Sequence, residues 1–445
     1  MQLSGKRVVV MGLGRFGGGA GVARFCVNQG AKVLITDVDP ADKLTAGLAM
    51  IKDLSVELRL GEHRVEDFTS ADLIVVNPAV KPDNTFVAAA VQAGVPLTSE
   101  IRLLVAHLPS RAKTIGITGS AGKSTTTAMT GHAMAKAVGA SRIHVGGNIG
   151  GSLLSQLPHI KDDHWVILEL SSFMLQGLRD DGWSPHIAAI TNLNANHLDW
   201  HGTLEHYRSA KQAIYDFQRD DAGDIAIGGP DVTASFTPRV KDYRAVAAQA
   251  DWPRDLLVPG EHNRLNARMA CAIVQAALGQ EPAVTCDALA DFPGLPHRLQ
   301  FVCEAAGVRY YNDSKATTPE AAMLAIESFP AGVVHVILGG YDKKADLAPL
   351  AKFAASRCRA IYTIGATGPS IARAAAGCSI PVHECQTMDN ALLVISTQVR
   401  RGDVVLLSTG CASWDQFENY EQRGQQFGEA VLKYTGEGAP IPPIV

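Results

Sequence analysis

A glycine-rich turn stands between an apolar run and an amphipathic run twice in this chain, at residues 12–17 and 116–125. In both places the apolar run has the length of a buried strand, and the run after it has the length of a helix. A third block, near residues 333–407, repeats the alternation of strand and helix. Because strands that alternate with helices form mainly parallel sheets, we predict an α/β fold in which the alternation starts three times.

The length of 445 residues is too great for one hydrophobic core and suggests about three domains. A loop rich in proline and glycine at residues 292–296 is a plausible linker. We therefore predict domains at residues 1–108, 109–294 and 295–445.

Composition excludes several classes of protein. The net charge of -4 gives no general attraction to nucleic acid, so no nucleic-acid partner is expected. No apolar stretch approaches the roughly 20 residues of a membrane span, and the N-terminus lacks a signal-peptide pattern. The eight cysteines form no CxxC pair and indicate reduced residues. We expect a cytoplasmic protein that does not bind membranes.

The first glycine turn, Gly12–Gly17, matches the G-x-G-x-x-G pattern directly after a predicted strand. Its glycines would let backbone N–H groups approach a phosphate at a helix N-terminus. Asp37 ends the next strand, where an acidic residue would meet a ribose hydroxyl. Taken alone, this predicts NAD, although the motif does not distinguish a dinucleotide from another diphosphate-linked nucleotide. A tight turn that binds nothing is the structural alternative.

The second turn, residues 116–125, departs from a strict P-loop because Ile117 stands where the first glycine belongs. Its glycines can still wrap a triphosphate with backbone N–H groups. Lys123 can then reach the terminal phosphates, and Ser124 can give its hydroxyl to Mg²⁺. The alternative is a chance turn that contains Gly-Lys-Ser.

Two polar residues follow apolar strands in the same block. Glu169 ends the strand at residues 165–170, and His197 follows the strand at residues 186–192. Ligands bind at the carboxyl ends of such strands, so this carboxylate and imidazole suit a divalent metal beside the P-loop. Each residue alone would read as an ordinary strand end or loop histidine. Lys211, from composition alone, reads as a surface lysine on a helix.

The third block carries polar clusters after its strands, in which Lys315, Lys343 and Ser413 are candidates to bind an anionic substrate. Spacing alone leaves solvated loops as the default for these residues.

Taken together, the motifs resemble the Mur ligases of peptidoglycan synthesis, over nearly the whole chain. The residues that carry the resemblance are GITGSAGKST, LELSSF, NLNANHLDWHG, YRSAK, GEHNRLNA, LPHRL, NDSKAT and STGCASWDQFENYEQRG. The nearest members join D-glutamate to UDP-N-acetylmuramoyl-L-alanine through an acyl phosphate. The resemblance implies a Rossmann-like first domain that binds UDP and a central P-loop, ATPase-like domain with a mainly parallel sheet that binds ATP. It likewise implies a Rossmann-like third domain that binds the incoming amino acid. It also implies ATP, two Mg²⁺ ions, small-molecule substrates and a monomer.

The resemblance assigns roles by position. Lys123, Glu169, His197 and Lys211 would be catalytic, with Ser124, Glu169, His197 and a carbamate on Lys211 as metal ligands. ATP would be bound by Gly119, Gly122, Lys123, Ser124, Thr125, Asn263, Asn266, Arg298 and Asp313. The UDP-linked substrate would be bound by Gly14, Arg15, Phe16, Gly17, Thr36, Asp37 and Asn148, which replaces the NAD interpretation. The glutamate would be bound by Lys315, Thr317, Lys343, Ser413 and Tyr420.

Two departures from the family pattern concern the substrate sites. Ala121 replaces the usual P-loop asparagine, and Asn77-Pro78-Ala79 replaces a typical Ser-Pro-Gly turn.

Three alternative functions stay open. They are a related ligase for L-glutamate or another amino acid, an NAD-dependent oxidoreductase, and a non-catalytic nucleotide-binding protein.

Overall fold

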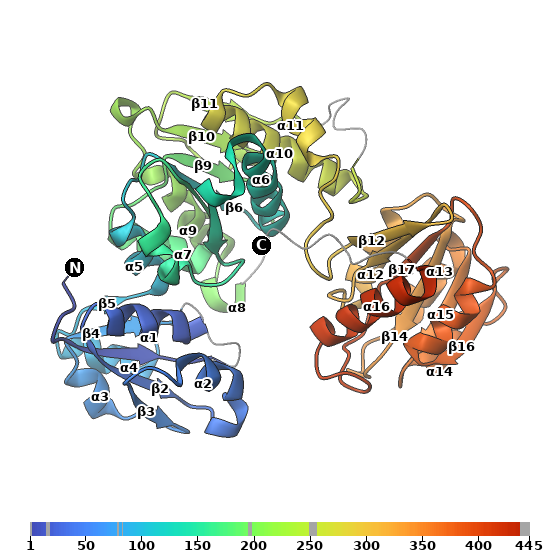
Figure 1. The fold of residues 1–445 in the computed structure, drawn as a ribbon, viewed down its shortest axis with the longest axis horizontal. Helices are drawn as coiled ribbons and strands as arrows, with labels where there is room; N and C mark the ends of the chain where they lie inside the picture. The colour runs from blue at the N-terminus through green and yellow to red at the C-terminus, as the bar shows by residue number, and fades with distance from the viewer. Residues whose placement is uncertain are drawn as a thin grey trace. The chain divides into compact units, whose positions relative to one another are not determined.

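The computed structural model describes residues 2–14, 18–77, 80–81, 83–194, 198–248 and 256–436, without the side chains of 198 and 199. These residues contain three sheets, coloured blue, green and orange to red in Figure 1. One compact unit takes in the described residues up to 248 together with 268–285, and a second takes in 256–267 and 286–436. The predicted class, three α/β domains with mainly parallel sheets, is confirmed. The predicted domain boundaries stay a prediction.

The N-terminal sheet is parallel, with strand order β3-β2-β1-β4-β5. Along β1, Val8 and Val10 pack into one hydrophobic cluster, and Val9 and Met11 pack into another. The sheet is therefore buried on both faces, as its apolar strands predict. Its elements are β1 (Arg7–Met11), α1 (Gly18–Asn28), β2 (Lys32–Asp37), α2 (Thr45–Ile51), β3 (Glu57–Leu60), α3 (Val65–Thr69), β4 (Leu73–Val76), α4 (Thr85–Gln92), β5 (Leu97–Thr98) and α5 (Glu100–His107).

The central sheet is also parallel, with strand order β11-β10-β9-β6-β8-β7. Helices α7 and α9 cover one face, and α6 lies on the other (Figure 1). The elements are β6 (Thr114–Thr118), α6 (Lys123–Val138), β7 (Ile143–Gly147), β8 (Trp165–Glu169), α7 (Ser172–Asp180), β9 (Ile187–Ile190), α8 (Leu198–His201), α9 (Leu204–Asp216), β10 (Ile225–Gly228), β11 (Tyr243–Ala245), α10 (Glu261–Leu278) and α11 (Pro282–Leu289).

The C-terminal sheet has strand order β12-β13-β17-β14-β15-β16, and β12 is antiparallel to β13 while the other pairs are parallel. The central strands β17 and β14 are fully buried, so the sheet is covered on both faces. The elements are β12 (Gln300–Ala305), β13 (Val308–Asn312), α12 (Pro319–Glu327), β14 (Val334–Gly339), α13 (Ala348–Arg357), β15 (Ala360–Ile364), α14 (Gly368–Ala374), β16 (Val382–Gln386), α15 (Met388–Ser396), β17 (Val404–Leu407) and α16 (Tyr420–Thr435).

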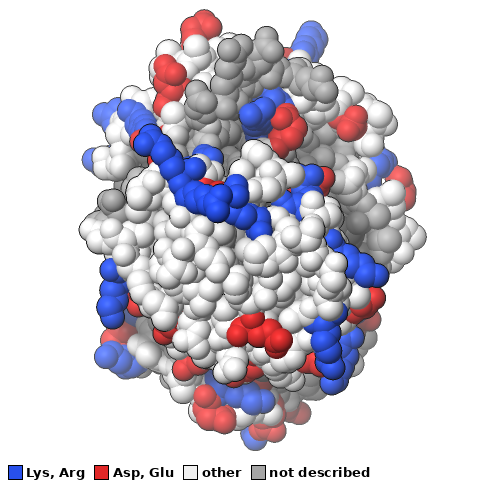
Figure 2. Space-filling view, turned by 90° about the vertical axis from the view of Figure 1, so that its right-hand side faces the viewer, with Lys and Arg blue, Asp and Glu red and all other residues white. Residues whose placement is uncertain are grey.

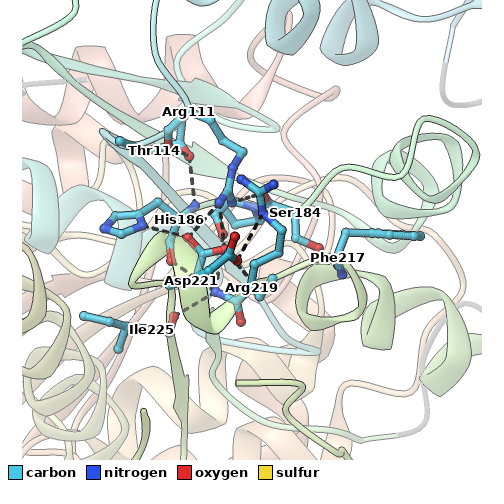
Figure 3. A network of polar contacts seen from close by, with 12 residues as sticks. Arg111, Thr114, Ser184, His186, Phe217, Arg219, Asp221 and Ile225 are labelled. Carbon is cyan, nitrogen blue, oxygen red and sulfur yellow. Dashed lines mark hydrogen bonds and ion pairs between the residues drawn. The ribbon is translucent and has the colours of Figure 1, made fainter. Parts of the chain in front are cut away.

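A buried carboxylate holds the amino ends of three central strands together (Figure 3). Asp224, before β10, accepts two hydrogen bonds from Arg111, at 2.7 Å each, and one from the backbone N–H of Arg219 at 2.8 Å. His186, before β9, lies 2.8 Å from the same carboxylate. Both Arg111 bonds come from Nη2, and such charge-assisted hydrogen bonds are stronger than neutral ones. This network lies at the amino ends of the strands, whereas ligands bind at the carboxyl ends in such sheets. The network therefore stabilises the fold and is not part of the site.

The surface in Figure 2 carries basic and acidic side chains close to one another around a wide uncharged area. This face is therefore not a continuous basic surface of the kind that binds nucleic acid. None of the helices within the described residues is long and apolar enough to cross a membrane.

Candidate active site

The P-loop lies at the carboxyl end of β6, where the buried strand passes into α6. Gly119 and Gly122 have φ angles of 149° and 78°, which are left-handed conformations that favour glycine. Gly122 caps α6 without a side-chain hydrogen bond. The N-terminus of α6, with its backbone N–H groups and partial positive charge, therefore lies at the P-loop, as at other helix N-termini that bind phosphate. Ser124 and Thr125 stand half-buried in this first turn.

The backbone of Ala121 is clamped by the segment that follows β9. Asn192 donates from Nδ2 to the carbonyl of Ala121 at 3.0 Å and accepts from its N–H at 2.9 Å. Thr191 adds a hydrogen bond from Oγ1 to the same carbonyl at 2.6 Å. The loop is thus held through its backbone, which explains how it keeps its shape with alanine in place of the family's asparagine.

Lys211, on α9, is buried beside the P-loop, with 1% of its surface exposed. Its Nζ donates to the carbonyl of Gly119 at 2.8 Å and lies 4.5 Å above the ring of Tyr207. Burial is the largest cause that lowers the pKa of Lys211, from 10.5 to about 7. The charge of Lys123 lowers this pKa further, and that of Glu169 raises it. The interpretation of Lys211 as a surface lysine is therefore wrong, and about half of its amine is uncharged at pH 7.

Tyr207 is a site residue that the sequence did not single out. Besides its ring contact with Lys211, its hydroxyl donates to Oγ of Ser120, in the P-loop, at 3.2 Å. Tyr207 stands four residues before Lys211 on α9, so the helix repeat places both side chains on one face. That i, i+4 spacing is the signal that could have found it.

Glu169, at the end of β8, has a buried carboxylate of which only one oxygen accepts a hydrogen bond among the described residues. Oε1 accepts a hydrogen bond from Nδ2 of Asn148 at 2.8 Å. Oε2 is buried without a hydrogen-bond partner among the described residues. An orphaned carboxylate oxygen at the ligand edge is costly unless a cation or a donor completes it. The donor chemistry of this position therefore fits Mg²⁺, which prefers oxygen ligands.

His197, Arg15, Phe16 and Gly17 lie outside the described residues. The segment leading to His197 is nevertheless tied to the P-loop. The N–H of Asn194 donates to Oγ of Ser120 at 2.8 Å, and that hydroxyl lies 2.8 Å from the Asn194 carbonyl.

Asp37, at the end of β2, braces the first glycine turn. Its Oδ2 accepts from the N–H groups of Leu13, at 2.9 Å, and Gly14, at 3.1 Å. The neighbouring Thr36 is fully buried, and its hydroxyl lies 2.7 Å from Nδ1 of His63. Asp37 thus holds the shape of the glycine turn. The sequence pattern predicted a ribose contact for Asp37 and not this role.

A pocket of about 260 Å³ lies at the carboxyl ends of β1, β4 and β7. Asn77, Asn148 and Glu100 are among its lining residues. Glu100, which begins α5, is the one ionisable side chain among the described residues that line the pocket. Burial raises the pKa of Glu100, and a hydrogen bond with Ser152 opposes this. The sequence did not single out Glu100, because an acidic residue in the first turn of a helix is ordinary.

In the second unit, Asp313 follows β13 and holds the residue after Arg298. Its Oδ1 accepts from the N–H of Leu299 at 3.0 Å, and its Oδ2 accepts from Oγ of Ser408 at 2.7 Å. Burial raises the pKa of Asp313 to about 7. Arg298 is exposed between His297 and Leu299, whose φ angles of 60° and 43° are unusual for side chains of this size. Such strain often marks a functional segment.

Of the residues assigned to the glutamate, Tyr420 begins α16, and the others lie on loops that follow strands of the C-terminal sheet. Lys315 Nζ lies 5.3 Å above the ring of Tyr420, and Ser413 is buried. Thr317 and Lys343 line a common small pocket of about 90 Å³. The structure thus brings Lys315 and Tyr420 together, and likewise Thr317 and Lys343.

Arg423, on α16, joins two of these loops and was not predicted. It is fully buried and donates to the Ser314 carbonyl at 2.7 Å, to Ser314 Oγ at 2.9 Å and to the Cys411 carbonyl at 3.1 Å. Burial lowers the pKa of Arg423 to about 10. An arginine on a helix gives no signal in sequence that its partners are distant carbonyls.

The two asparagines assigned to ATP, which the family resemblance implies as contacts of its adenine base, stand one turn apart on α10. Asn263 donates from Nδ2 to the carbonyl of Pro259 at 2.7 Å, and Asn266 donates to Oδ1 of Asn263 at 3.3 Å. Both are buried. Their contact with a base stays a prediction.

Three family models match the chain. Residues 6–99 match the Mur ligase MurD-like N-terminal domain, residues 117–246 the Mur ligase middle domain, and residues 297–411 the Mur ligase glutamate ligase domain.

Among curated proteins, the chain is 36% identical to the UDP-N-acetylmuramoylalanine--D-glutamate ligase of Acidobacterium capsulatum, over 99% of both chains. It is 38% identical to the ligase of that name from Roseiflexus sp., over 98% of this chain and all of the relative. Among solved structures, the MurC ligase of Thermotoga maritima matches with a TM-score of 0.58 at 20% identity, over 96% of this chain and all of that one. At that identity the likeness concerns the fold alone.

Proposed function

The chain belongs to the Mur ligase family, and on that premise we propose that it joins D-glutamate to UDP-N-acetylmuramoyl-L-alanine with conversion of ATP to ADP and phosphate. The observation that carries this proposal is the end-to-end match to ligases named for that reaction. The P-loop with Lys123, Glu169 and the buried Lys211 supports it, because these groups suit phosphoryl transfer.

In the first step, an oxygen of the substrate carboxylate attacks the γ-phosphorus of ATP. The bond from that phosphorus to the β,γ-bridging oxygen breaks, and ADP leaves with the electron pair. Lys123 Nζ lies at the P-loop, 3.2 Å from the Ser120 carbonyl. Together with the N–H groups of the first turn of α6, it would meet the phosphates and counter the charge on the transferring group. The product is an acyl phosphate, which is reactive enough to form an amide.

Glu169 Oε2 and the Ser124 hydroxyl would hold one Mg²⁺ ion. A carbamate on Lys211, with His197, would hold a second. When bound, the ions neutralise the negative charge that accumulates on the phosphate oxygens. Lys211 suits this role because its amine lies at the P-loop with a pKa of about 7.

In the second step, the amine of glutamate attacks the acyl carbon, and a tetrahedral intermediate collapses with loss of phosphate and a proton. Lys315, Thr317, Lys343, Ser413 and Tyr420 would bind the glutamate. Asn148, Asp37 and the first glycine turn would bind the UDP-linked substrate.

The direct test measures phosphate release from ATP with UDP-N-acetylmuramoyl-L-alanine and Mg²⁺, across a panel of D- and L-amino acids. We expect release that depends on D-glutamate and on both other substrates, and loss of release in Lys123→Met. Release with L-glutamate but not D-glutamate would assign the chain to a related ligase. Tight NAD(H) binding without turnover of ATP would contradict the ligase proposal.

A cytoplasmic location and a monomeric state are also proposed. The location follows from the scattered cysteines and the soluble nucleotide-linked substrate. Sedimentation of the purified protein would test the oligomeric state.

A further inference from the structure

Two exposed aromatic rings and a lysine meet on the loops that follow β14 and β17. Trp414 is 60% exposed and Tyr341 is 42% exposed. Their ring centroids lie 5.5 Å apart at an angle of 60°. Lys343 Nζ lies 4.7 Å above the Trp414 ring. Single exposed apolar residues are common, but apolar surface gathered in one place often marks a site of interaction.

The backbone fixes the two loops against each other. The N–H of Tyr341 donates to the carbonyl of Ala412 at 2.8 Å, and the N–H of Gly339 donates to the carbonyl of Thr409 at 2.9 Å. A side chain at Gly340 would overlap the Ala412 carbonyl, so the close approach requires glycine there. The ring of Trp414 is therefore presented beside Lys343 by ordered backbone.

On the loop that follows β14, Asp342 forms an ion pair with Lys344. Asp342 accepts from the N–H of Lys344 at 2.7 Å and from its Nζ at 3.2 Å. Lys344 has a φ of 64°, a strained conformation for lysine. Asp415, next to Trp414, accepts from the N–H of Ala366 at 2.8 Å. The nearby carboxylates are thus engaged elsewhere, and the Lys343 ammonium rests on a ring.

An ammonium on the face of an aromatic ring keeps its charge and its outward N–H donors. Lysine has a flexible four-carbon stem, so a free Lys343 would sample many positions. Contact with the indole face restricts these positions and leaves the ammonium ready for an anion. Thr317 lines the same pocket as Lys343, and Ser413 precedes Trp414 in the chain.

We propose that Trp414 is a positioning residue for binding of the acceptor amino acid. The Trp414 ring holds the Lys343 ammonium in the place where that ammonium meets a carboxylate of the acceptor. The inference rests on the proposed function, because it takes Lys343 as an acceptor-binding residue. Tyr341 supports the ring from its side. The contact acts on acceptor affinity and not on phosphoryl transfer, which the P-loop performs.

The test compares KM for D-glutamate, with ATP and the UDP-linked substrate saturating, in the wild type, Trp414→Leu and Trp414→Phe. Loss of an exposed cation–π contact corresponds to a rise of about two- to fivefold in KM. We expect that rise in Trp414→Leu with kcat unchanged, and a KM near the wild-type value in Trp414→Phe. The KM values for ATP and the UDP-linked substrate should not move.

A double-mutant cycle with Lys343→Met shows whether Trp414 acts through Lys343. On the Lys343→Met background, Trp414→Leu should have no further effect on KM for D-glutamate. Tyr434→Leu, which removes another exposed ring, should leave KM unchanged. An unaltered KM in Trp414→Leu, or the same fold rise on both backgrounds, would overturn the inference. Wild-type protein that ligates no amino acid would instead refute the proposed function.

Discussion

Lys211 should react with carbon dioxide to form a carbamate at neutral pH. Removing a charged side chain beside it should shift the pH at which half of the carbamate has formed. In the expected reaction, the uncharged amine attacks the carbon of CO₂, an N–C bond forms, and a proton leaves the nitrogen for solvent. The product is a carbamate, an anion suited to bind Mg²⁺. The reaction requires the free amine, so its extent follows the pKa of Lys211.

The magnitude follows from that pKa of about 7. At pH 7 about half of the Lys211 side chains are uncharged, against roughly one in three thousand for a lysine with a pKa of 10.5. Lys123→Met removes a like charge and should raise the pKa of Lys211. Glu169→Gln removes an opposite charge and should lower it. The two substitutions therefore shift the free-amine fraction at a given pH in opposite directions.

The assay records ¹³C NMR spectra of protein in ¹³C-bicarbonate between pH 6 and 9. We expect a carbamate signal that grows with pH, with a midpoint near 7, and that is absent in Lys211→Met. Lys433→Met, which removes an exposed lysine on α16, should keep the signal. A signal that survives Lys211→Met, or a midpoint near the ordinary lysine pKa, would refute the reasoning.

Lys211→Ala should lose ligase activity, and added short carboxylates should partly restore it. Full activity of this variant without added carboxylates would refute the carbamate's role.

Three further substitutions test other parts of the account. Lys123→Met should lower kcat at least about a hundredfold by removing charge at the phosphates, with steady-state kinetics as the measure. Arg423→Met leaves the two Ser314 oxygens without the donor that Arg423 supplies, and it removes one of two donors to the Cys411 carbonyl, which keeps Thr409 Oγ1 at 3.0 Å. The substitution should cost roughly 3 kcal/mol in unfolding free energy, measured in urea. Glu100→Gln keeps a hydrogen bond to Ser152 but cannot ionise. Because ionised Glu100 would repel a diphosphate, wild-type KM for the UDP-linked substrate should rise with pH, and that of the variant should not.

Much of the fold was predictable, because apolar runs and turns are local signals. The expected strands at 165–170 and 186–192 match β8 and β9. β11 and β12 are among the strands that were missed. β11 has only three residues, and β12 has only two buried residues, so neither shows a clear apolar alternation. Along residues 228–259, weak periodicity gave no assignment, and β11 is the strand found there within the described part.

The candidate site was predictable only where its residues belong to motifs. The P-loop and Glu169 follow from strand ends and glycines. The burial of Lys211 does not, because its neighbours Gly119 and Tyr207 meet it only through packing of α9 on the sheet. The support of Lys343 by Trp414 depends likewise on two loops far apart in the chain.

The central claim, transfer of the γ-phosphoryl group of ATP to a substrate carboxylate, can be tested by following oxygen. UDP-N-acetylmuramoyl-L-alanine with ¹⁸O in its terminal carboxylate is converted with ATP, Mg²⁺ and D-glutamate, and the released phosphate is analysed by mass spectrometry. Formation and collapse of an acyl phosphate should leave one carboxylate oxygen in each phosphate. Phosphate free of ¹⁸O would show that ATP is cleaved without activating the carboxylate, and would contradict the account.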